Sequence, residues 1–291
     1  MPQKYLVAYN GMGTGLGNRV RVVLSAQILA EREQRRLLYV WPTGRDFGPT
    51  FTELFDFEGG RAVSRATSRV LAKRYPYRDA TLSWLDDDRR AERLWQIRTG
   101  GALDLPHGWP TWGDRLRQLH PVAEVADRIE RLYSAELAGA PYVGVMIRAH
   151  EVSHPETKQA SPVDWFVERM ASLRQERPDI RFFVCCDVPE VQDEVMKTIG
   201  GCVAQRDKGG YNTTQGVRSS LVDLYLLACS QRLVAPHFSS FIHMAQHLAG
   251  DVVPIETSRT NGLQGGGGEE LASAVDPLRP WSRAGRPEQS A

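Results

Sequence analysis

Residues 218–250 read RSSLVDLYLLACSQRLVAPHFSSFIHMAQHLAG and predict a helix, a short buried strand and a second helix. In the first helix the apolar residues recur at spacings of three and four, and Ser219 or Ser220 can cap its start. Residues 232–235 are apolar after the first position and are typical of a buried strand. The stretch therefore places two helices around a strand, which is the arrangement from which α/β folds are built.

The second helix of this stretch is a candidate anion site. Ser239 or Ser240 can cap its first turn, and the helix ends near Gly250. The free N–H groups at a helix start and the helix dipole both favour negative charge. Because this helix starts where a strand ends, the site would lie at the mouth of a sheet. The sequence predicts an anion there without naming it.

The chain has 291 residues and the composition of a globular protein, with 42% apolar and 24% charged residues. That length can hold two domains of ordinary size. The formal net charge of +1 gives no electrostatic case for nucleic acid or a membrane surface as a partner. No stretch approaches about 18 apolar residues and no cleavage signal is evident, so we expect a cytoplasmic protein without a membrane span. The excess of arginine, alanine and glycine suggests a bacterial gene.

The cysteines, histidines and clustered aspartates do not form a recognisable metal pattern. All four cysteines have apolar neighbours and none belongs to a C-x-x-C pair, so we expect reduced core thiols. His243 and His247 are four residues apart, but no glutamate follows His243 as H-E-x-x-H requires. Residues 86–88 are three aspartates followed by two arginines, which favours a solvated charge run over a metal-binding D-x-D. We therefore expect no metal and no cofactor.

Alternating strands and helices predict two doubly wound α/β domains with a boundary at residues 138–141. The first domain begins with a strand, a glycine-rich loop, a helix from Asn18 to near Arg35 and a second strand. The second domain alternates five strands with four helices and predicts a parallel sheet covered on both faces. The expected strands are residues 5–9, 37–41, 142–148, 181–186, 202–205, 232–235 and 251–255. Expected helices of the second domain include 161–176, capped by Ser161, and 187–199.

Polar loops follow most of these strands. In such sheets ligands bind at the carboxyl ends of the strands, and two domains that face each other would bring both sets of loops around one cleft. The marked loops are residues 10–18, 149–160, 187–190, 206–218 and 236–240. All but 206–218 follow a clearly predicted strand. The order of elements in residues 45–120 is not evident.

The glycine-rich loop NGMGTGLG at residues 10–17 is not a dinucleotide fingerprint. The G-x-G-x-x-G pattern requires glycine where Leu16 or Asn18 stands, and no G-K-[ST] follows as a P-loop requires. The loop still permits close approach of a ligand to the backbone, with Asn18 and Arg19 at the helix start. A plain flexible turn is the alternative.

Arg148 ends a strand that reads VGVMIR. An arginine in an apolar strand is costly unless its guanidinium emerges and meets an anion. The planar fork of arginine suits a phosphate. A structural ion pair with a core carboxylate is the alternative.

Four carboxylates are candidate site residues. Asp223 lies among apolar residues and must be paired or bind something; it could accept two N–H bonds from a guanine edge or make helix-to-loop hydrogen bonds. Asp187 follows a strand and could instead cap the next helix. Glu151 and Glu156 lie in the loop after Arg148, where His150 and His154 also stand. Any of these could act as a general base, or the loop could simply be solvated.

Four ordered motifs resemble the fucosyltransferase superfamily with the GT-B fold. That superfamily includes bacterial α-1,2- and α-1,6-fucosyltransferases, nodulation fucosyltransferases and protein O-fucosyltransferases. The resemblance covers the start of the chain and most of residues 140–255. The motifs are GLGNRV from Gly15 to Val20, VGVMIR from Val143 to Arg148, FFVCCDVPEV from Phe182 to Val191, and the segment from Asp223 to Phe241.

The resemblance implies an inverting, metal-independent transferase with two Rossmann-like domains facing a cleft. GDP-fucose or a related GDP-sugar would be the donor, and the hydroxyl group of a small molecule or glycan the acceptor. Residues 1–138 would form the acceptor-side domain and residues 139–256 the nucleotide-sugar domain. Residues 257–291 would be a tail rich in glycine and proline, partly disordered.

The resemblance also assigns roles to residues. The catalytic group would be Arg148 on the donor phosphates, Asn18 near the reaction centre, and Glu156 or, second, Glu151 as base. The donor-binding group would be Gly15, Gly17, Arg19, Asp187, Asp223 for guanine, and Ser239, Ser240 and Phe241 at the phosphate-binding helix start.

The sequence departs from the family pattern around Arg148. The family carries H-x-R-R or H-x-R-x-x-D, whereas Met146 holds the histidine position, Ala149 that of the second arginine and Glu151 that of the acid. Two alternatives therefore stay open. One is a GT-B transferase that uses another nucleotide sugar, and the other is a non-catalytic protein that binds a nucleotide sugar or glycan.

Overall fold

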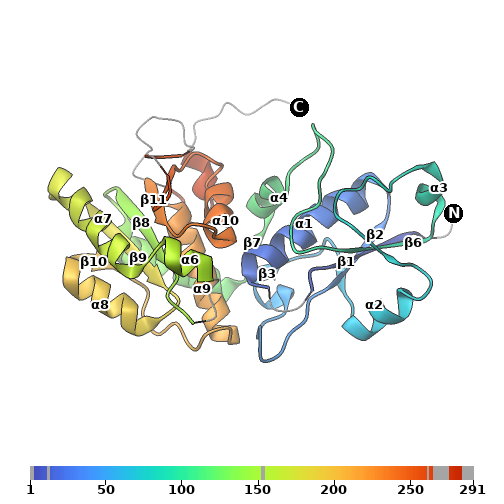
Figure 1. The fold of residues 1–291 in the computed structure, drawn as a ribbon, viewed down its shortest axis with the longest axis horizontal. Helices are drawn as coiled ribbons and strands as arrows, with labels where there is room; N and C mark the ends of the chain where they lie inside the picture. Colours follow the sequence, from blue (N-terminus) through green and yellow to red (C-terminus); the bar gives the residue numbers. More distant parts are fainter. Residues whose placement is uncertain (1–2, 12–13, 152–154, 261, 265–274, 284–291) are drawn as a thin grey trace. The chain divides into compact units, whose positions relative to one another are not determined.

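The computed structural model describes residues 3–11, 14–151, 155–260, 262–264 and 275–283, and it divides into two compact units. The first unit is Met1–Val122 with Asn212–Val217, and the second is Ala123–Tyr211 with Arg218–Ala291. Figure 1 labels the helices and strands of both. Most of the predicted tail, two residues of the glycine-rich loop and His154 lie outside the described residues.

The first unit is built on a five-stranded parallel sheet in the order β4-β2-β1-β6-β5. The central strand β1 reads YLVAY, and Leu6 and Val7 are fully buried, as expected for a parallel strand covered on both faces. The strands are β1 (Tyr5–Tyr9), β2 (Arg36–Val40), β4 (Arg61–Ala62), β5 (Tyr77–Arg78) and β6 (Leu94–Arg98). The two long predicted strands of this domain are therefore confirmed, with ends shifted by one residue in β2.

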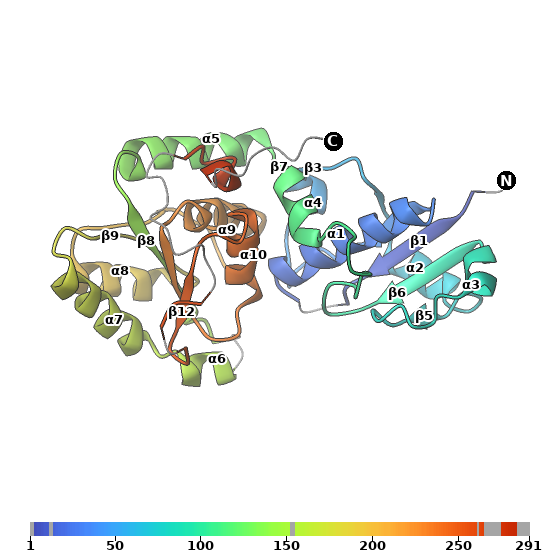
Figure 2. The same cartoon turned by 90° about the horizontal axis from the view of Figure 1, so that it is seen from above.

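Helices cover both faces of the first sheet: α1 and α4 lie side by side on one face, and α2 lies on the other (Figures 1 and 2). The region that the sequence left unordered contains short elements, which explains its weak periodicity. A two-stranded antiparallel pair, β3 with β7, accompanies them. The bounds are α1 (Leu16–Arg32), η1 (Phe51–Glu53), β3 (Phe55–Asp56), α2 (Arg65–Leu71), α3 (Asp87–Ala91), α4 (Trp112–Gln118) and β7 (His120–Pro121).

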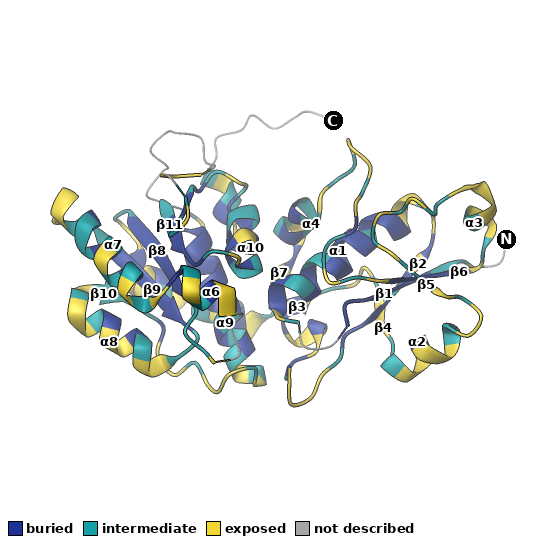
Figure 3. Ribbon diagram, in the orientation of Figure 1, coloured by how far each residue is buried: buried dark blue, intermediate teal, exposed yellow. Residues whose placement is uncertain are grey.

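The second unit has a parallel sheet in the order β10-β9-β8-β11-β12, a doubly wound arrangement with β8 at its centre. Its three central strands β9, β8 and β11 are mostly buried (Figure 3), and Phe166, Met170 and Leu173 of α7 pack against β8 and β9. The strands are β8 (Tyr142–Ile147), β9 (Arg181–Cys186), β10 (Cys202–Val203), β11 (Arg232–Ala235) and β12 (Ile255–Thr257). The other elements are α5 (Ala123–Leu132), η2 (Tyr133–Leu137), α6 (Pro155–Ala160), α7 (Val163–Glu176), α8 (Pro189–Ile199), α9 (Thr214–Ala228), α10 (Ser240–Leu248) and η3 (Pro280–Arg283).

The structure divides the chain between Val122 and Ala123, whereas the sequence analysis placed the boundary at residue 138. Helix α5 belongs to the second unit because its polar side chains bond within that unit. The Arg128 guanidinium donates to the Arg206 carbonyl at 2.7 Å and to Ser219 Oγ at 3.2 Å. These contacts join residues distant in sequence, so periodicity alone could not place the helix.

Two predicted helix caps are wrong. Helix α9 begins at Thr214 rather than after Ser219 or Ser220, because Thr213 Oγ1 accepts the N–H of Gly216 at 3.0 Å and starts the helix earlier. Ser161 does not cap α7, which begins at Val163 with Pro162 in the capping position.

Two segments near the sheet edge also differ from prediction. The loop expected at residues 149–160 contains helix α6. The last strand is Ile255–Thr257 rather than 251–255, because Gly250 and Asp251 both have positive φ and prolong the turn after α10. Among the described residues, no helix is long and apolar enough to cross a membrane.

Candidate functional site

The carboxyl ends of three adjacent strands in the second unit carry predicted site residues. Strands β9, β8 and β11 are neighbours in a parallel sheet, so the segments that follow them leave the same edge. Arg148 follows β8, Asp187 follows β9, and Ser239 stands between β11 and α10. The fold therefore brings these three positions to one edge, as the sequence predicted.

Arg148 is anchored at one end of its guanidinium and open at the other. Its Nε lies 3.3 Å from Asp187 Oδ2, and its side chain is 32% exposed. Neither terminal Nη group has a hydrogen bond to any residue in the described part of the chain. The anchored side chain thus presents two N–H-bearing nitrogens in a fixed direction, which suits a phosphate oxygen pair.

Asp187 organises the segment that follows β8. Its Oδ1 accepts the backbone N–H groups of Ala149 at 2.7 Å and His150 at 3.0 Å. It does not cap α8, whose capping residue is Val188. Asp187 therefore fixes both Arg148 and the backbone beside it.

The start of α10 has no capping side chain. Ser239 occupies the cap position and is buried, but its hydroxyl makes no cap hydrogen bond; it lies 3.9 Å from Met146 Sδ instead. The first N–H groups of the helix, at Ser240 and Phe241, are therefore available to an anion. The preceding turn is held by Ser161, whose Oγ accepts the His237 N–H at 2.9 Å.

The carboxylate of Asp223 is 5% exposed and lies in a network of hydrogen bonds between α9 and the loop before it. Its Oδ1 accepts from Gln205 Nε2 at 2.9 Å, and its Oδ2 accepts from Lys208 Nζ at 3.1 Å. Burial raises the pKa of Asp223, and the Lys208 charge opposes that rise. The helix-to-loop hydrogen bonds considered as the alternative are therefore present, while a carboxylate keeps further lone pairs for a ligand.

The two candidate bases lie in exposed positions. Glu156 is on α6, and its Oε1 lies 3.6 Å from Arg259 Nη1, a pair that is about half exposed. Glu151 is exposed, and its backbone carbonyl accepts from Lys158 Nζ at 3.2 Å. His150 stacks on Tyr211 with ring centroids 3.9 Å apart.

The glycine-rich loop of the first unit leads into α1, which begins at Leu16 with Gly15 as its capping residue. The predicted start at Asn18 is two positions late. A Cβ at Gly15 would meet nothing within 4 Å, so this part of the loop faces open space, whereas Gly17 is buried. Asn18 Oδ1 is buried without a hydrogen-bond partner among the described residues. An unpaired buried acceptor is unusual and marks Asn18 as a functional candidate.

Arg19 lies inside the first unit. Its side chain is almost fully buried, with Nε donating to the Thr14 carbonyl at 2.8 Å and Nη1 to the Pro42 carbonyl at 2.7 Å. The guanidinium also lies 4.2 Å from the Phe47 ring centroid. Burial lowers the pKa of Arg19 to about 10. These contacts make Arg19 a support of the glycine-rich loop rather than a group that presents its charge to a donor.

Sequence reasoning missed several residues at the sheet edge of the second unit. Lys208 and Gln205 hold Asp223, and Tyr211 stacks on His150. Phe238 is exposed and has a φ of 59°, a strained conformation just before the start of α10. Neither motif nor periodicity marks a single lysine or glutamine in a polar loop, so only the fold could reveal these residues.

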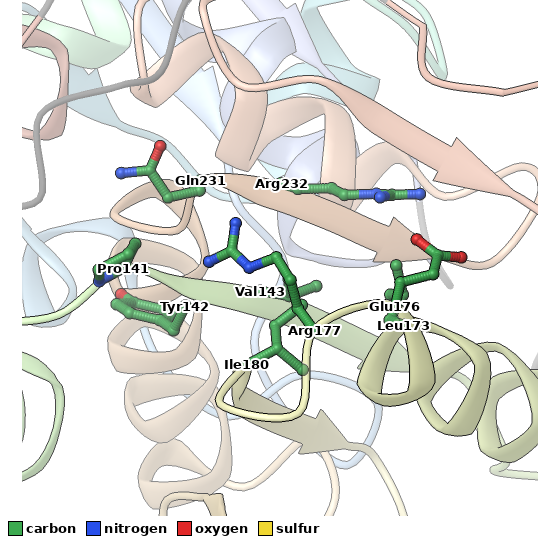
Figure 4. Close-up of a pocket in the computed structure, with 9 residues that line it drawn as sticks. All are labelled: Pro141, Tyr142, Val143, Leu173, Glu176, Arg177, Ile180, Gln231 and Arg232. Carbon is green, nitrogen blue, oxygen red and sulfur yellow. The ribbon is translucent and has the colours of Figure 1, made fainter.

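A cavity of about 160 Å³ lies at the opposite edge of the same sheet. It is lined at the amino ends of β8 and β11 by Tyr142, Gln231 and Arg232, with Arg177 across from them (Figure 4). None of the predicted site residues borders it. In the part of the chain that the structure describes, no three His, Cys, Asp or Glu side chains group as metal ligands would.

Comparison with known proteins gives matches in structure alone. No protein-family model matches the sequence, and no curated protein matches it. The fucosyltransferase NodZ from Bradyrhizobium aligns with a TM-score of 0.61 at 18% identity, covering 91% of this chain and 98% of that one. Arabidopsis thaliana FUT1 aligns with a TM-score of 0.57 at 17% identity, covering 87% and 70%. POFUT1 in complex with GDP aligns with a TM-score of 0.52 at 14% identity, covering 88% and 99%.

The chain has a fucosyltransferase-like GT-B fold. The predicted fold class and the predicted family resemblance are confirmed at this level.

Proposed function

We propose that this protein is a glycosyltransferase that moves fucose or a related sugar from a GDP-sugar to a hydroxyl group of a small molecule or glycan. The observation that carries the proposal is the position of Arg148. It directly follows β8 and is held by Asp187, and the neighbouring strand β11 leads into α10. Free guanidinium N–H groups and an uncapped helix start are two anion-binding devices on neighbouring strands. A diphosphate suits such a pair.

The fold relatives support a guanine nucleotide as the donor group. NodZ, an α-1,6-fucosyltransferase, was crystallised with GDP and soaked with GDP-fucose, and POFUT1 was crystallised with GDP. In this chain Asp223 is the candidate reader of guanine, because a carboxylate can accept the two adjacent N–H groups of that base. The departures at Met146 and Ala149 bear on which sugar the GDP carries.

The proposed reaction is a single displacement with inversion at the anomeric carbon. The acceptor oxygen forms a bond to that carbon as its bond to the β-phosphate oxygen breaks, and GDP leaves with the electron pair. Arg148 and the N–H groups of Ser240 and Phe241 would stabilise the charge that grows on the β-phosphate. Stabilisation that increases during bond cleavage accelerates the reaction rather than only tightening binding. No metal or cofactor takes part in this scheme.

A carboxylate would take the proton of the acceptor hydroxyl. Glu156 is the first candidate and Glu151 the second, since both follow Arg148 and both are exposed to an incoming acceptor. Glu156 lies on helix α6 and its Oε1 is 3.6 Å from Arg259 Nη1. Replacing each by glutamine distinguishes them: the base variant loses turnover while retaining affinity for GDP.

We assign acceptor recognition to the first unit and donor recognition to the second. The glycine-rich loop, with open space at Gly15 and an unpaired Oδ1 at Asn18, is the candidate contact of the first unit with substrate. Asn18→Ala would then reduce transfer while leaving GDP affinity close to that of the wild type.

Donor identity can be tested by thermal denaturation in the presence of GDP-, UDP- and dTDP-sugars. A ligand that binds only the folded state raises the free energy of unfolding by RT ln(1 + [L]/Kd), and Tm rises with it. We expect a rise with GDP and GDP-fucose. A rise with UDP- or dTDP-sugars alone would instead identify a transferase for another nucleotide sugar. Binding of GDP-fucose without GDP release, with or without glycan acceptors, would identify a non-catalytic binding protein.

A further inference from the structure

Lys208 is a buried lysine that the proposed mechanism does not use. Its side chain is 12% exposed, and Nζ donates to Asp223 Oδ2 at 3.1 Å and to the Cys186 carbonyl at 3.0 Å. Cys186 ends β9, the strand beside β8. Lys208 therefore ties the Asp223 carboxylate of α9 to the edge of the sheet from which Arg148 projects.

The loop that carries Lys208 is itself fixed by buried polar side chains. Gln205 Nε2 donates both to Asp223 Oδ1 at 2.9 Å and to the Ser219 carbonyl at 2.8 Å, and Gln192 Nε2 donates to the Gln205 carbonyl at 3.1 Å. Arg128 of α5 holds the next residue by its carbonyl at 2.7 Å. These bonds fix the loop on both sides of Gln205, and Gln205 and Lys208 contact the carboxylate itself.

We propose that Lys208 is a positioning residue for nucleobase recognition: its ammonium group holds the Asp223 carboxylate in the orientation in which it accepts N–H groups from the base of the donor nucleotide. This inference rests on the proposed function, since it assigns a partner to the residue proposed to read guanine. A carboxylate has about four lone-pair directions, of which Lys208 and Gln205 occupy one each. The remaining two suit the adjacent N1–H and N2–H donors of guanine.

The charges of Lys208 and Asp223 make the GDP affinity expected of a Lys208 variant depend on pH. Burial raises the pKa of Asp223, while Lys208, Gln205 and Arg128 act to lower it. The pKa of Lys208 is raised. Burial lowers it, but the charge of Asp223 outweighs burial. Each group therefore stabilises the charged form of the other.

The two cysteine thiols beside the cluster do not change charge over the useful range. Burial raises the pKa of the Cys185 thiol well above its ordinary value and that of Cys186 to about 11, so both remain neutral near pH 7. Asp187 and the guanidinium of Arg128 are the remaining charged groups around the cluster. A difference in the pH profile of GDP affinity between a Lys208 variant and the wild type would thus report on Asp223.

The test is GDP affinity, measured by calorimetry from about pH 6 to pH 8.5, in the wild type, Lys208→Met, Lys208→Arg and the control Lys197→Met. Lys197 is exposed on α8. We expect Lys208→Met to lose about tenfold or more in affinity at pH 7, because a hydrogen bond to a charged group is lost and Asp223 is no longer held. Without Lys208 the pKa of Asp223 rises further, so affinity falls as pH is lowered and recovers as it is raised. Lys208→Arg restores part of the affinity, and Lys197→Met matches the wild type.

The outcomes separate this inference from the proposed function. If Lys208→Met binds GDP within about twofold of the wild type with an unchanged pH profile while Asp223→Asn does not bind, Lys208 is only structural and the proposed function stands. If the wild type itself does not bind GDP, the proposed function fails. If Lys208→Met does not fold, Lys208→Gln replaces it, because its amide can still donate to Asp223 but carries no charge. Wild-type GDP affinity with an unchanged pH profile in Lys208→Gln would overturn the inference.

Discussion

Arg19 lies in the first turn of α1 in the first unit and Arg148 directly follows β8 in the second, and the sequence assigned both to the substrate. Their surroundings differ sharply. Arg19 is 1% exposed and donates to two backbone carbonyls, whereas Arg148 is 32% exposed and contacts one carboxylate through Nε. A buried guanidinium that donates to two backbone carbonyls stabilises its unit, while one with free Nη groups can bind an anion. Burial, which no motif reports, separates the two roles.

Among the variants that test this difference between the two arginines, Arg148→Ala is expected to have the largest effect. Removing one donor that stabilises developing charge lowers the rate by about 10²–10³-fold. We expect release of GDP from GDP-fucose to fall by that factor, with little change in Tm because the side chain is partly exposed and makes one ion pair. Arg177→Ala, an exposed arginine near the cavity at the opposite edge, is the matched control. Turnover close to that of the wild type in Arg148→Ala would remove Arg148 from the reaction.

Arg19→Met should show the opposite behaviour. The substitution leaves the Thr14 and Pro42 carbonyls without their donor, and we expect a loss of about 2–4 kcal/mol in the free energy of unfolding. GDP affinity of the folded variant should remain close to that of the wild type. Urea denaturation with intrinsic fluorescence measures the first quantity and calorimetry the second. Arg36→Ala, exposed on β2, should change stability by no more than about 0.5 kcal/mol.

The result that would reverse this assignment is a variant of Arg19 that unfolds like the wild type but no longer binds GDP. Such an outcome would place Arg19 with Arg148 among the groups that contact the donor.

The ion pair with Asp187 distinguishes Arg148 from a surface arginine that has no partner. Asp187→Ala removes both the ion pair and the acceptor for the Ala149 and His150 N–H groups, and we expect about a tenfold loss of GDP affinity. Asp187→Asn keeps the amide oxygen as an acceptor, so its loss should be smaller. Equal affinity in both variants and in the wild type would mean that Arg148 needs no anchor.

The smallest effect is expected at Ser161, which holds the turn before α10 without contacting a ligand. Ser161→Ala leaves the His237 N–H without its acceptor, and we expect a stability loss of about 1 kcal/mol with GDP affinity lowered no more than a few-fold. Ser258→Ala, which removes the hydroxyl bonded to the other side of Ser161, is the comparison variant. A loss of GDP affinity as large as that of Arg148→Ala would indicate that the turn itself contacts the donor.

The long strands and helices could be predicted because each carries its own pattern. YLVAY and FFVCC are continuous apolar runs of the kind that only a strand covered on both faces provides, and both were found where expected. The short elements of residues 45–120 could not be ordered, since strands of two residues bury too little to produce periodicity. Helix starts were misplaced where more than one hydroxyl residue was available, as at Thr213 and Ser219.

The sequence by itself determined the parallel α/β architecture, the fucosyltransferase-like resemblance and the placement of Arg148 and Ser239 at strand ends, because these follow from local periodicity and from the order of motifs. Only the tertiary structure decided which polar side chains are already satisfied. Three contacts join residues that are not neighbours along the chain. They are the hydrogen bond from Arg19 to the Pro42 carbonyl, the ion pair of Arg148 with Asp187 and that of Lys208 with Asp223. Hydrogen bonding and burial at such contacts depend on packing, and packing is not encoded in the spacing of residues along one segment.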